Sequence, residues 1–323
     1  MTDDAVHMRR AMALAGGVRG TTSPNPWVGA VVEPGGASGA TQPPGGPHAE
    51  VVALRRAGAA ASGATLYVTL EPCAHTGRTP PCVDAIVDAG VARVVVGVED
   101  PDERVRGAGI RALRAAGVTV DVGVCAEEVA EQLAPYLKHR RTGRPWVVLK
   151  LAASLDGRTA APDGSSRWIT GAAARTDAHR LRAESDAVIV GAGTVRADDP
   201  SLTVRAVEGR DPLRVVLGKA PGGARLHPAL ELTGDLGEIL DELGQRGVVQ
   251  ALVEGGATVA GEFHRAGLVD RYVLYLAPAL FGGDDAWPLF TGPGAATIAE
   301  VWRGRIRSVH PLGDDLRIEC SPA

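Results

Sequence analysis

Residues 64–98 read ATLYVTLEPCAHTGRTPPCVDAIVDAGVARVVVGV, and this stretch decides the fold class of the first half of the chain. An apolar run at 64–70 predicts a buried strand, and a second run at 92–98, rich in valine, predicts another. Between them, 81–89 has helical character and ends at Gly90, a residue type that commonly follows the last turn of a helix. A strand, a helix and a strand in this order predict a parallel or mixed sheet with helices packed on it, the α/β class.

The alternation of helix and strand patterns continues along the rest of the chain. In the first half it predicts helices at 3–15, 48–57 and 110–116 and strands at 28–33 and 118–122. In the second half it predicts strands at 146–151, 187–190, 213–217, 248–253 and 271–276, and helices at 172–183, 237–244 and 258–266. The segment 35–47 is rich in Gly and Pro and is expected to be one loop.

A short basic run at 138–145, KHRRTGRP, interrupts this alternation. It has two interpretations, a nucleic-acid-binding patch and a solvated linker, and a run this short is usually solvated. Pro145 discourages a helix from continuing through Arg144. We therefore expect a linker here and place a domain boundary near residue 143, which gives domains of 1–143 and 144–323.

Composition excludes several classes of protein. Hydrophobic residues make up 45% and charged residues 22% of the chain, so a mainly disordered state is excluded. The net charge of -4 argues against a nucleic-acid coat or a membrane-surface binder. No segment has the roughly 18 apolar residues that a membrane span needs, and four cysteines are too few for a disulfide framework. We expect a cytoplasmic, two-domain globular protein that binds neither nucleic acid nor membrane, and composition indicates no particular chemistry.

The residues most typical of chemistry are His48, Glu50, Cys73 and Cys82, in the patterns H-A-E and two Pro-Cys pairs. One His and two thiolates are three strong zinc ligands, and three protein ligands leave a fourth position open for water, as in catalytic sites. Glu50 lies two residues from the His and is suited to carry a proton there, the arrangement used by zinc deaminases. Two alternatives are a structural zinc site with His75 as fourth ligand, and a helix-capping His beside buried cysteines.

The second half has weaker signals. Lys150 is a lone lysine in an apolar strand, where a side chain that snorkels to solvent is the commoner interpretation. Gly255 and Gly256 follow the strand 248–253 and precede a helix, a place where backbone N–H groups can approach a phosphate. The pattern is not G-x-G-x-x-G, so it does not predict a Rossmann fold. Taken alone, the glycine pair is more often just a tight turn.

Four stretches of the first half form a recognisable set: TTSPNPWVG at 21–29, HAE at 48–50, TLEPCAHTGRTPPC at 69–82, and the segment from Asp100 to Gly109. They resemble the motifs of the bifunctional riboflavin-biosynthesis deaminase–reductases. The resemblance implies a cytidine-deaminase-like domain that removes an amino group hydrolytically from 2,5-diamino-6-(5-phosphoribosylamino)pyrimidin-4-one. It also implies these roles: zinc binding by His48, Cys73 and Cys82; proton transfer by Glu50; positioning of the pyrimidine by Asn25; contact with the ribose phosphate by Arg78.

One departure from the family concerns the loop before His48. The family usually has an aromatic residue and a His there, and the corresponding positions of this chain hold Ala40 and Thr41. If that His contacts the substrate, this chain lacks one hydrogen-bonding group. The resemblance then leaves the zinc chemistry intact and puts substrate affinity or loop order in question.

The second half resembles the reductase domain of the same family, which is similar to dihydrofolate reductase. The motifs include KLAASLDGR at 150–158, SRWIT at 166–170, DDPSLTVR at 198–205 and VEGG at 253–256. The resemblance implies hydride transfer from NADPH to the ribose C1′, which opens the sugar to a ribityl chain. It places Ala152, Trp168, Thr194, Asp198, Gly256, Ala257 and Thr258 at NADPH, and Ser166, Arg182, Leu202, Arg205 and Glu254 at the substrate.

The segment 217–236 is short for this family and falls where a contact with a cofactor phosphate is expected. Because this segment is short, the choice of NADPH over NADH rests on the resemblance. Lys219 and Arg225 are the candidate partners of a 2′-phosphate. Two other functions stay open. One is a zinc deaminase of a free base or of tRNA with an accessory second domain, and the other is a non-catalytic zinc or nucleotide-binding protein. The resemblance also favours a homo-oligomer, either a dimer or a tetramer.

Overall fold

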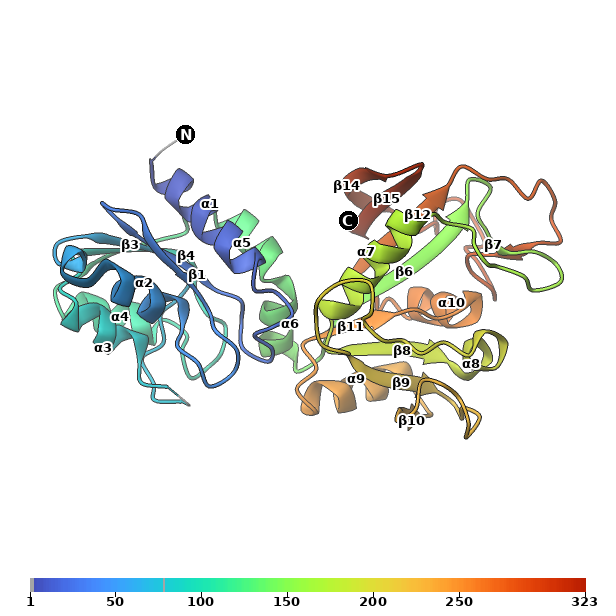
Figure 1. Ribbon diagram of the computed structural model, residues 1–323, viewed down its shortest axis with the longest axis horizontal. Coiled ribbons are helices and arrows are strands. Elements are labelled where there is room, and N and C mark those ends of the chain that lie inside the picture. The colour runs from blue at the N-terminus through green and yellow to red at the C-terminus, as the bar shows by residue number, and fades with distance from the viewer. Residues whose placement is uncertain (1–2, 78) are drawn as a thin grey trace. The chain divides into compact units, whose positions relative to one another are not determined.

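The computed structural model describes residues 3–77 and 79–323. The chain divides into two compact units, Met1–Gly143 and Arg144–Ala323 (Figure 1). Each unit has its own sheet, and the long sheets of the two units share no strand. Each is described below by itself.

The described residues of the first unit form a five-stranded mixed sheet in the order β2-β1-β3-β4-β5. Its strands are β1 (Gly29–Glu33), β2 (Ala37–Ala40), β3 (Thr65–Leu70), β4 (Arg93–Val98) and β5 (Thr119–Val122). Strand β1 is antiparallel to β2 and β3, and β3, β4 and β5 are parallel. The helices are α1 (Asp3–Gly16), α2 (Ala49–Ala57), α3 (Cys82–Asp88), α4 (Ala108–Ala115), α5 (Ala126–Gln132) and α6 (Ala134–Thr142), with a short 3₁₀ turn at Gly58–Ala61.

Two expectations about this unit are wrong. The segment 35–47 is not one loop, because β2 forms within it and pairs with β1 after a turn in which Gly35 and Gly36 have positive φ. The run 138–145 is not a linker, because most of it belongs to α6. Buried Tyr136 and Leu137 stabilise that helix through packing, and Gly143 ends it in the left-handed conformation. The restriction imposed by Pro145 falls on Arg144, one residue beyond this cap.

The second unit contains an eight-stranded sheet in the order β10-β9-β8-β11-β6-β12-β15-β14. Its strands are β6 (Trp146–Ser154), β8 (Ala187–Gly191), β9 (Leu213–Leu217), β10 (Leu230–Leu232), β11 (Gln250–Val253), β12 (Arg271–Ala277), β14 (Gly304–Leu312) and β15 (Asp315–Pro322). The strands from β10 to β12 are parallel, and β15 and β14 form an antiparallel hairpin at the end. A small separate sheet joins β7 (Arg158–Ala160) to β13 (Trp287–Pro288).

Helices cover both faces of the eight-stranded sheet. They are α7 (Ala172–Ala183), α8 (Ala192–Asp198), α9 (Leu236–Gln245) and α10 (Ala257–Arg265). Val147 and Leu149 of β6 pack in one apolar cluster with α9 and α10, whereas Val148 packs in another with α7 and α8. Adjacent residues of a strand face opposite sides, so a parallel strand buried on both sides is apolar throughout. No helix in the described part of the chain combines the length and the apolarity needed to cross a bilayer.

The packing of α1 on β1 leaves no room for a side chain at Gly29. A Cβ atom there would lie 1.9 Å from the carbonyl oxygen of Ala11 on α1. We predict that Gly29→Ala lowers the free energy of unfolding of the first unit by about 2 kcal/mol or more, because the backbone of α1 or β1 must shift to make room for the methyl group. The control is Gly16→Ala at the end of α1, where the nearest atom to the added Cβ is a side-chain nitrogen at 3.5 Å. Urea unfolding of the two variants measures the difference, and equal midpoints would contradict the prediction.

Candidate active sites

The predicted zinc ligands of the first unit come together at one end of the sheet. His48 lies directly before α2, Cys73 follows β3, and Cys82 is the first residue of α3. Nδ1 of His48 lies 3.2 Å from Sγ of Cys82 and 3.7 Å from Sγ of Cys73. The backbone N–H of Cys82 donates to Sγ of Cys73 over 3.4 Å. The sulfur atom therefore faces the N-terminus of α3, where a thiolate is electrostatically favoured.

This donor set fits a zinc ion. A tetrahedral zinc ion with bonds of about 2.3 Å to sulfur and about 2.0 Å to nitrogen separates its ligand atoms by about 3.5 to 3.8 Å. The three donor atoms all lie within 4.8 Å of one another, a spread that small side-chain rotations close. Hydrogen bonds with the Cys82 thiol and then with His48 stabilise the thiolate of Cys73 and lower the pKa of that thiol. A thiolate is the form that binds metal.

Glu50 lies in the first turn of α2 and faces the same cavity as His48 and Cys73. Only 4% of it is exposed, and burial raises the pKa of its carboxyl group. A carboxyl group beside a metal site can accept and release a proton. Glu50 is not one of the three residues whose donor atoms cluster.

Asn25 also lines this cavity, together with Pro26, Val28, Thr41, Leu70, Glu71 and Asp100. A tight turn presents it, because its backbone N–H donates to the carbonyl of Thr22 over 2.9 Å. Thr41 stands at the position of the missing His, and its hydroxyl is already bonded to the backbone of Val28 at 3.1 and 3.4 Å. The hydroxyl of Thr41 therefore holds the backbone just before β1, and it is not a free hydrogen-bonding group in place of the His. Arg78, the expected phosphate contact, lies outside the described residues.

Glu71 is a residue of this site to which the sequence assigned no role. It is 4% exposed, and its carboxylate accepts backbone N–H groups from Asp100, Gly107, Gly109 and Ile110 at 2.9 to 3.2 Å. A Cβ atom on Gly109 would lie 1.8 Å from the carbonyl oxygen of Pro72. Glu71 thus holds the segment 100–110 against the loop that carries Cys73. The resemblance of 100–109 was the only signal in the sequence for this contact.

In the second unit, two helices begin at the carboxyl ends of adjacent strands. Strands β8 and β11 are parallel neighbours; β8 runs directly into α8 at Gly191, and β11 leads through a turn at 254–256 into α10. The backbone N–H of Gly256 donates to Oγ1 of Thr194 over 3.1 Å. A Cβ atom on Gly255 would lie 2.6 Å from Val259. Such paired helix N-termini beside bare backbone suit the phosphates of a dinucleotide.

A cluster of charged groups lies close to the turn between β11 and α10. Arg182 on α7 donates through Nε and a terminal nitrogen to both carboxylate oxygens of Glu254, at 2.5 and 2.9 Å, and also to the carbonyl of Thr203. Burial acts to raise the pKa of Glu254, but the charge and hydrogen bonds of Arg182 outweigh it and hold the pKa below its usual range. The ammonium of Lys150 lies 5.7 Å from the ring centre of Tyr275, and its charge also acts to lower the pKa of Glu254. Burial lowers the pKa of Lys150.

The interpretation of Lys150 as an ordinary snorkelling residue therefore misses its surroundings. His179 is a further residue that the sequence did not single out. Its Nδ1 accepts the backbone N–H of Arg205 over 3.3 Å, and it lies one helical turn before Arg182 on α7. The segment 201–205, with the buried Leu202 at φ 53°, is thus held by α7 at two points.

The other predicted reductase residues lie on four segments. Ala152 is on β6, opposite Tyr275 of β12. Ser166 and Trp168 lie between β7 and α7, and Trp168 is 66% exposed with the Arg175 guanidinium 4.6 Å from its ring centre. Asp198 ends α8, and its carbonyl accepts a hydrogen bond from Arg167. Ala257 and Thr258 begin α10, where Thr258 lies 3.1 Å from Thr291, hydroxyl to hydroxyl.

The segment 217–236 borders a pocket at the carboxyl ends of β9 and β10. The lining residues are Leu217, Gly218, Leu232, Thr233, Gly234, Asp235, Leu236, Ile239 and Glu262. Lys219 is exposed beside Gly218, and the backbone N–H of Arg225 donates to Asp199. The pocket lining itself contains acidic side chains and no basic one.

Comparison with known proteins covers almost the whole chain. The cytidine and deoxycytidylate deaminase zinc-binding region matches residues 1–98, and the RibD C-terminal domain matches residues 145–317. The riboflavin biosynthesis protein RibD of Mycobacterium tuberculosis H37Rv is 48% identical over 93% of this chain and 91% of its own length.

The chain belongs to the RibD family. The RibD of Escherichia coli K12 is 40% identical, with 97% of this chain and 98% of that protein covered. Among solved structures, Acinetobacter baumannii RibD matches with a TM-score of 0.92 at 40% identity, over 99% of both chains. The Thermotoga maritima diaminohydroxyphosphoribosylaminopyrimidine deaminase/5-amino-6-(5-phosphoribosylamino)uracil reductase matches with a TM-score of 0.89 at 35% identity, again over 99% of both. The prediction of a zinc deaminase joined to a reductase of riboflavin biosynthesis is confirmed.

The Arg182–Glu254 pair provides a test of the charge cluster. We predict that Arg182→Met lowers the free energy of unfolding of the second unit by about 3 kcal/mol, because it leaves a buried carboxylate without its main partner. The pKa of Glu254 is depressed in the folded protein. The stabilisation by the Arg182–Glu254 pair is therefore present above the ordinary Glu pKa and is lost as the pH falls. The loss in Arg182→Met should therefore shrink in acid.

The control for this variant is Arg246→Met, which breaks an exposed pair with Glu242 on α9. It should cost about 0.5 kcal/mol or less. Urea unfolding at neutral and acidic pH measures both variants. An equal cost for the two, or a cost for Arg182→Met that does not change with pH, would contradict the prediction.

Proposed function

We propose that the unit 1–143 deaminates 2,5-diamino-6-(5-phosphoribosylamino)pyrimidin-4-one hydrolytically, and that the unit 144–323 reduces the ribosyl side chain of the product with NADPH. The observation that carries the proposal is the cavity that His48, Cys73, Glu50 and Asn25 share, in a chain of the RibD family. The Thermotoga maritima relative carries both activities in its name.

In the deaminase reaction, His48, Cys73 and Cys82 would hold zinc. When bound, zinc supplies Lewis-acid activation of a water molecule near neutral pH. Glu50 takes the proton from the attacking water and delivers it to the amino group that leaves, so that a C–O bond replaces the C–N bond and ammonia departs. Asn25 orients the pyrimidine through its amide, and Arg78 pairs with the ribose phosphate.

In the reductase reaction, Thr194 in the first turn of α8 and the turn at Gly256 hold the cofactor phosphates, with Ala257 and Thr258 at the start of α10. Ala152, Trp168 and Asp198 complete the cofactor side. When bound, NADPH supplies the hydride that C1′ of the sugar receives.

The substrate side of the same site is formed by Ser166, Arg182, Leu202, Arg205 and Glu254. Two arginines suit a phosphate ester, because a guanidinium matches its oxygens. Glu254 anchors Arg182 so that its guanidinium keeps one orientation. The two hydrogen bonds between α7 and the segment 201–205 keep Leu202 and Arg205 in place.

The proposal includes a homo-oligomer, a dimer or a tetramer, in the cytoplasm. In its support, β14 is an edge strand that exposes Ile306 and Val309, at 67% and 49%, and an open strand edge can pair with its own copy about a twofold axis. All four cysteines are unpaired, and zinc-binding thiols need a reducing compartment. Sedimentation of the full chain gives the number of copies.

The role of Glu50 gives the test of the deaminase. We predict that Glu50→Ala lowers ammonia release by about a thousandfold or more, because the proton carrier is lost, and that the variant keeps one zinc per chain. The control is Glu127→Ala, an exposed residue in the first turn of α5. Ammonia release and metal content measure both. Full ammonia release by Glu50→Ala would overturn the mechanism, and zinc without any deamination by the natural chain would favour the non-catalytic alternative.

The reductase proposal is tested by cofactor oxidation with pre-deaminated substrate. We predict oxidation of NADPH in preference to NADH. Lys219→Glu should raise the KM for NADPH roughly tenfold and leave that for NADH unchanged, because it removes a charge partner of the 2′-phosphate. Arg225→Glu is the paired variant, since either residue can supply that contact. No oxidation of either cofactor by folded protein would sink the reductase proposal, and equal rates with both would overturn the preference.

A further inference from the structure

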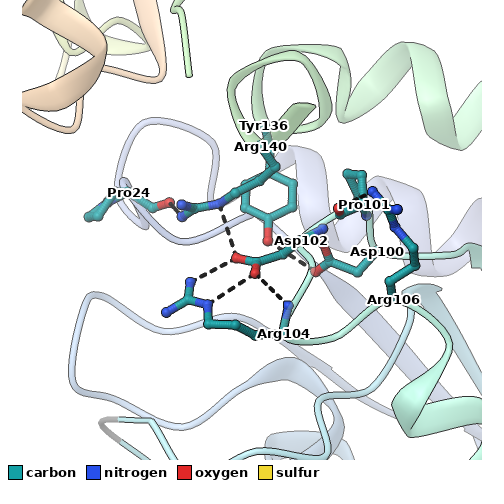
Figure 2. A network of polar contacts seen from close by, with 8 residues as sticks. All are labelled: Pro24, Asp100, Pro101, Asp102, Arg104, Arg106, Tyr136 and Arg140. Carbon is teal, nitrogen blue, oxygen red and sulfur yellow. Dashed lines mark hydrogen bonds and ion pairs between the residues drawn. The ribbon is translucent and has the colours of Figure 1, made fainter. Parts of the chain in front are cut away.

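Helix α6 carries two side chains that reach the loops of the deaminase cavity, although the sequence predicts a linker there. Figure 2 shows Tyr136 and Arg140 of α6 side by side, directed toward Asp100 and Asp102 and toward Pro24. Asp100 is itself a lining residue of the cavity that contains His48. The helix is thus connected to the site through contacts within the first unit.

The contact between Tyr136 and Asp100 is buried. Tyr136 is 4% exposed and Asp100 is 4% exposed, and the tyrosine hydroxyl donates to Oδ2 of Asp100 over 3.0 Å. Oδ1 of the same carboxylate accepts the backbone N–H of Asp102 over 2.9 Å. The two hydrogen bonds approach different oxygens, so the plane of the carboxyl group at the cavity wall is determined by both (Figure 2).

Arg140 connects two different loops. Its Nε lies 3.8 Å from Oδ2 of Asp102, and a terminal nitrogen donates to the carbonyl of Pro24 over 3.4 Å. Its guanidinium carbon lies 5.1 Å from the ring centre of Tyr136, which keeps the side chain over the ring. Pro24 directly precedes Asn25 in the turn that lines the cavity.

We propose that Tyr136 and Arg140 are positioning residues of the deaminase reaction, which hold the Asp100 and Asn25 loops in the substrate-binding arrangement. The inference rests on the deaminase function proposed above for the cavity. A carboxylate and an amide that face a pyrimidine can accept and donate hydrogen bonds to its ring nitrogens and amino groups. Their value for binding depends on orientation, and α6 supplies that orientation without touching the substrate.

The charges around Asp100 give this proposal a second readout. Burial raises the pKa of Asp100, and the hydrogen bonds from Asp102 and Tyr136 oppose that effect. The charged or titratable groups that act on it include Asp102 and Arg104 in its own loop, Glu71 at the end of β3 and Tyr136 on α6. Removal of the tyrosine hydroxyl takes one donor from the carboxylate, so the pKa of Asp100 should rise further.

The test compares Tyr136→Phe with Tyr67→Phe in the full-length zinc-loaded chain. Tyr67 is the matched control, because it is 5% exposed and its hydroxyl donates to Asp4 over 2.9 Å, away from the cavity. For Tyr136→Phe we expect a rise of roughly tenfold in the KM for deamination with a smaller change in kcat, since a buried bond to a carboxylate is lost. The acidic limb of kcat/KM should move to higher pH.

Zinc content and the rate of cofactor oxidation with pre-deaminated substrate should be unchanged in Tyr136→Phe, which shows that both units are folded. Arg140→Gln is the second variant, and it should raise the KM without moving the acidic limb. If Tyr136→Phe deaminates with the KM and pH profile of Tyr67→Phe, the proposal is overturned. If Tyr136→Phe loses zinc, the proposal stands or falls on the KM of Arg140→Gln. Absence of deamination in the natural chain would instead refute the function of the cavity.

Discussion

The carboxylate of Glu71 accepts four backbone N–H groups from the segment 100–110, and the deaminase cavity is built around that arrangement. Glu71 follows β3 and precedes Cys73 by two residues, so the segment is anchored next to a metal-binding thiol. A buried carboxylate needs several donors to offset the loss of water, and backbone N–H groups provide them only in one loop conformation. The need to satisfy one charge therefore determines where Asp100 lies.

The second unit meets the same physical demand with a different solution. There the buried carboxylate of Glu254 is paired with the guanidinium of Arg182, with Lys150 nearby. The charge pair costs desolvation, and a hydrophobic pair of similar size would be as stable. The pair holds the guanidinium in one orientation, which suits the role at a phosphate ester that we propose for Arg182. In both units the polar groups lie at the carboxyl ends of parallel strands, where side chains from different segments converge.

Helix α6 shows how a segment between two domains can belong to a site. Its Tyr136 and Arg140 contact loops that are more than 30 residues and more than 100 residues away in the sequence, respectively. The packing of α6 in the first unit therefore also brings its side chains against the loops of the cavity. The contacts of α6 with Asp100 and Pro24 lie within the first unit, so the helix is part of that unit and not a linker.

The sequence alone determined most of the elements and the metal donors. Apolar periodicity depends on neighbours in the chain, so the βαβ pattern around 64–98, the helix 172–183 and the strand 213–217 could be predicted closely. The zinc donors were predictable because their residue types are rare and chemically specific, and Gly256 because a turn must join a strand to a helix. The C-terminal hairpin, β10, α8 and β2 gave only weak local patterns, and tertiary pairing decided them.

Only the tertiary structure decided how distant polar groups meet. Glu71 with 100–110, Tyr136 with Asp100, Arg182 with Glu254 and Thr41 with Val28 are contacts between residues far apart in sequence or without a distinctive local pattern. A basic run reads as solvated surface until packing buries part of it, and a lysine in an apolar strand reads as a surface residue until a carboxylate is placed beside it. Burial makes each unsatisfied polar group costly, so these pairings follow from the folded arrangement and not from the order of residues.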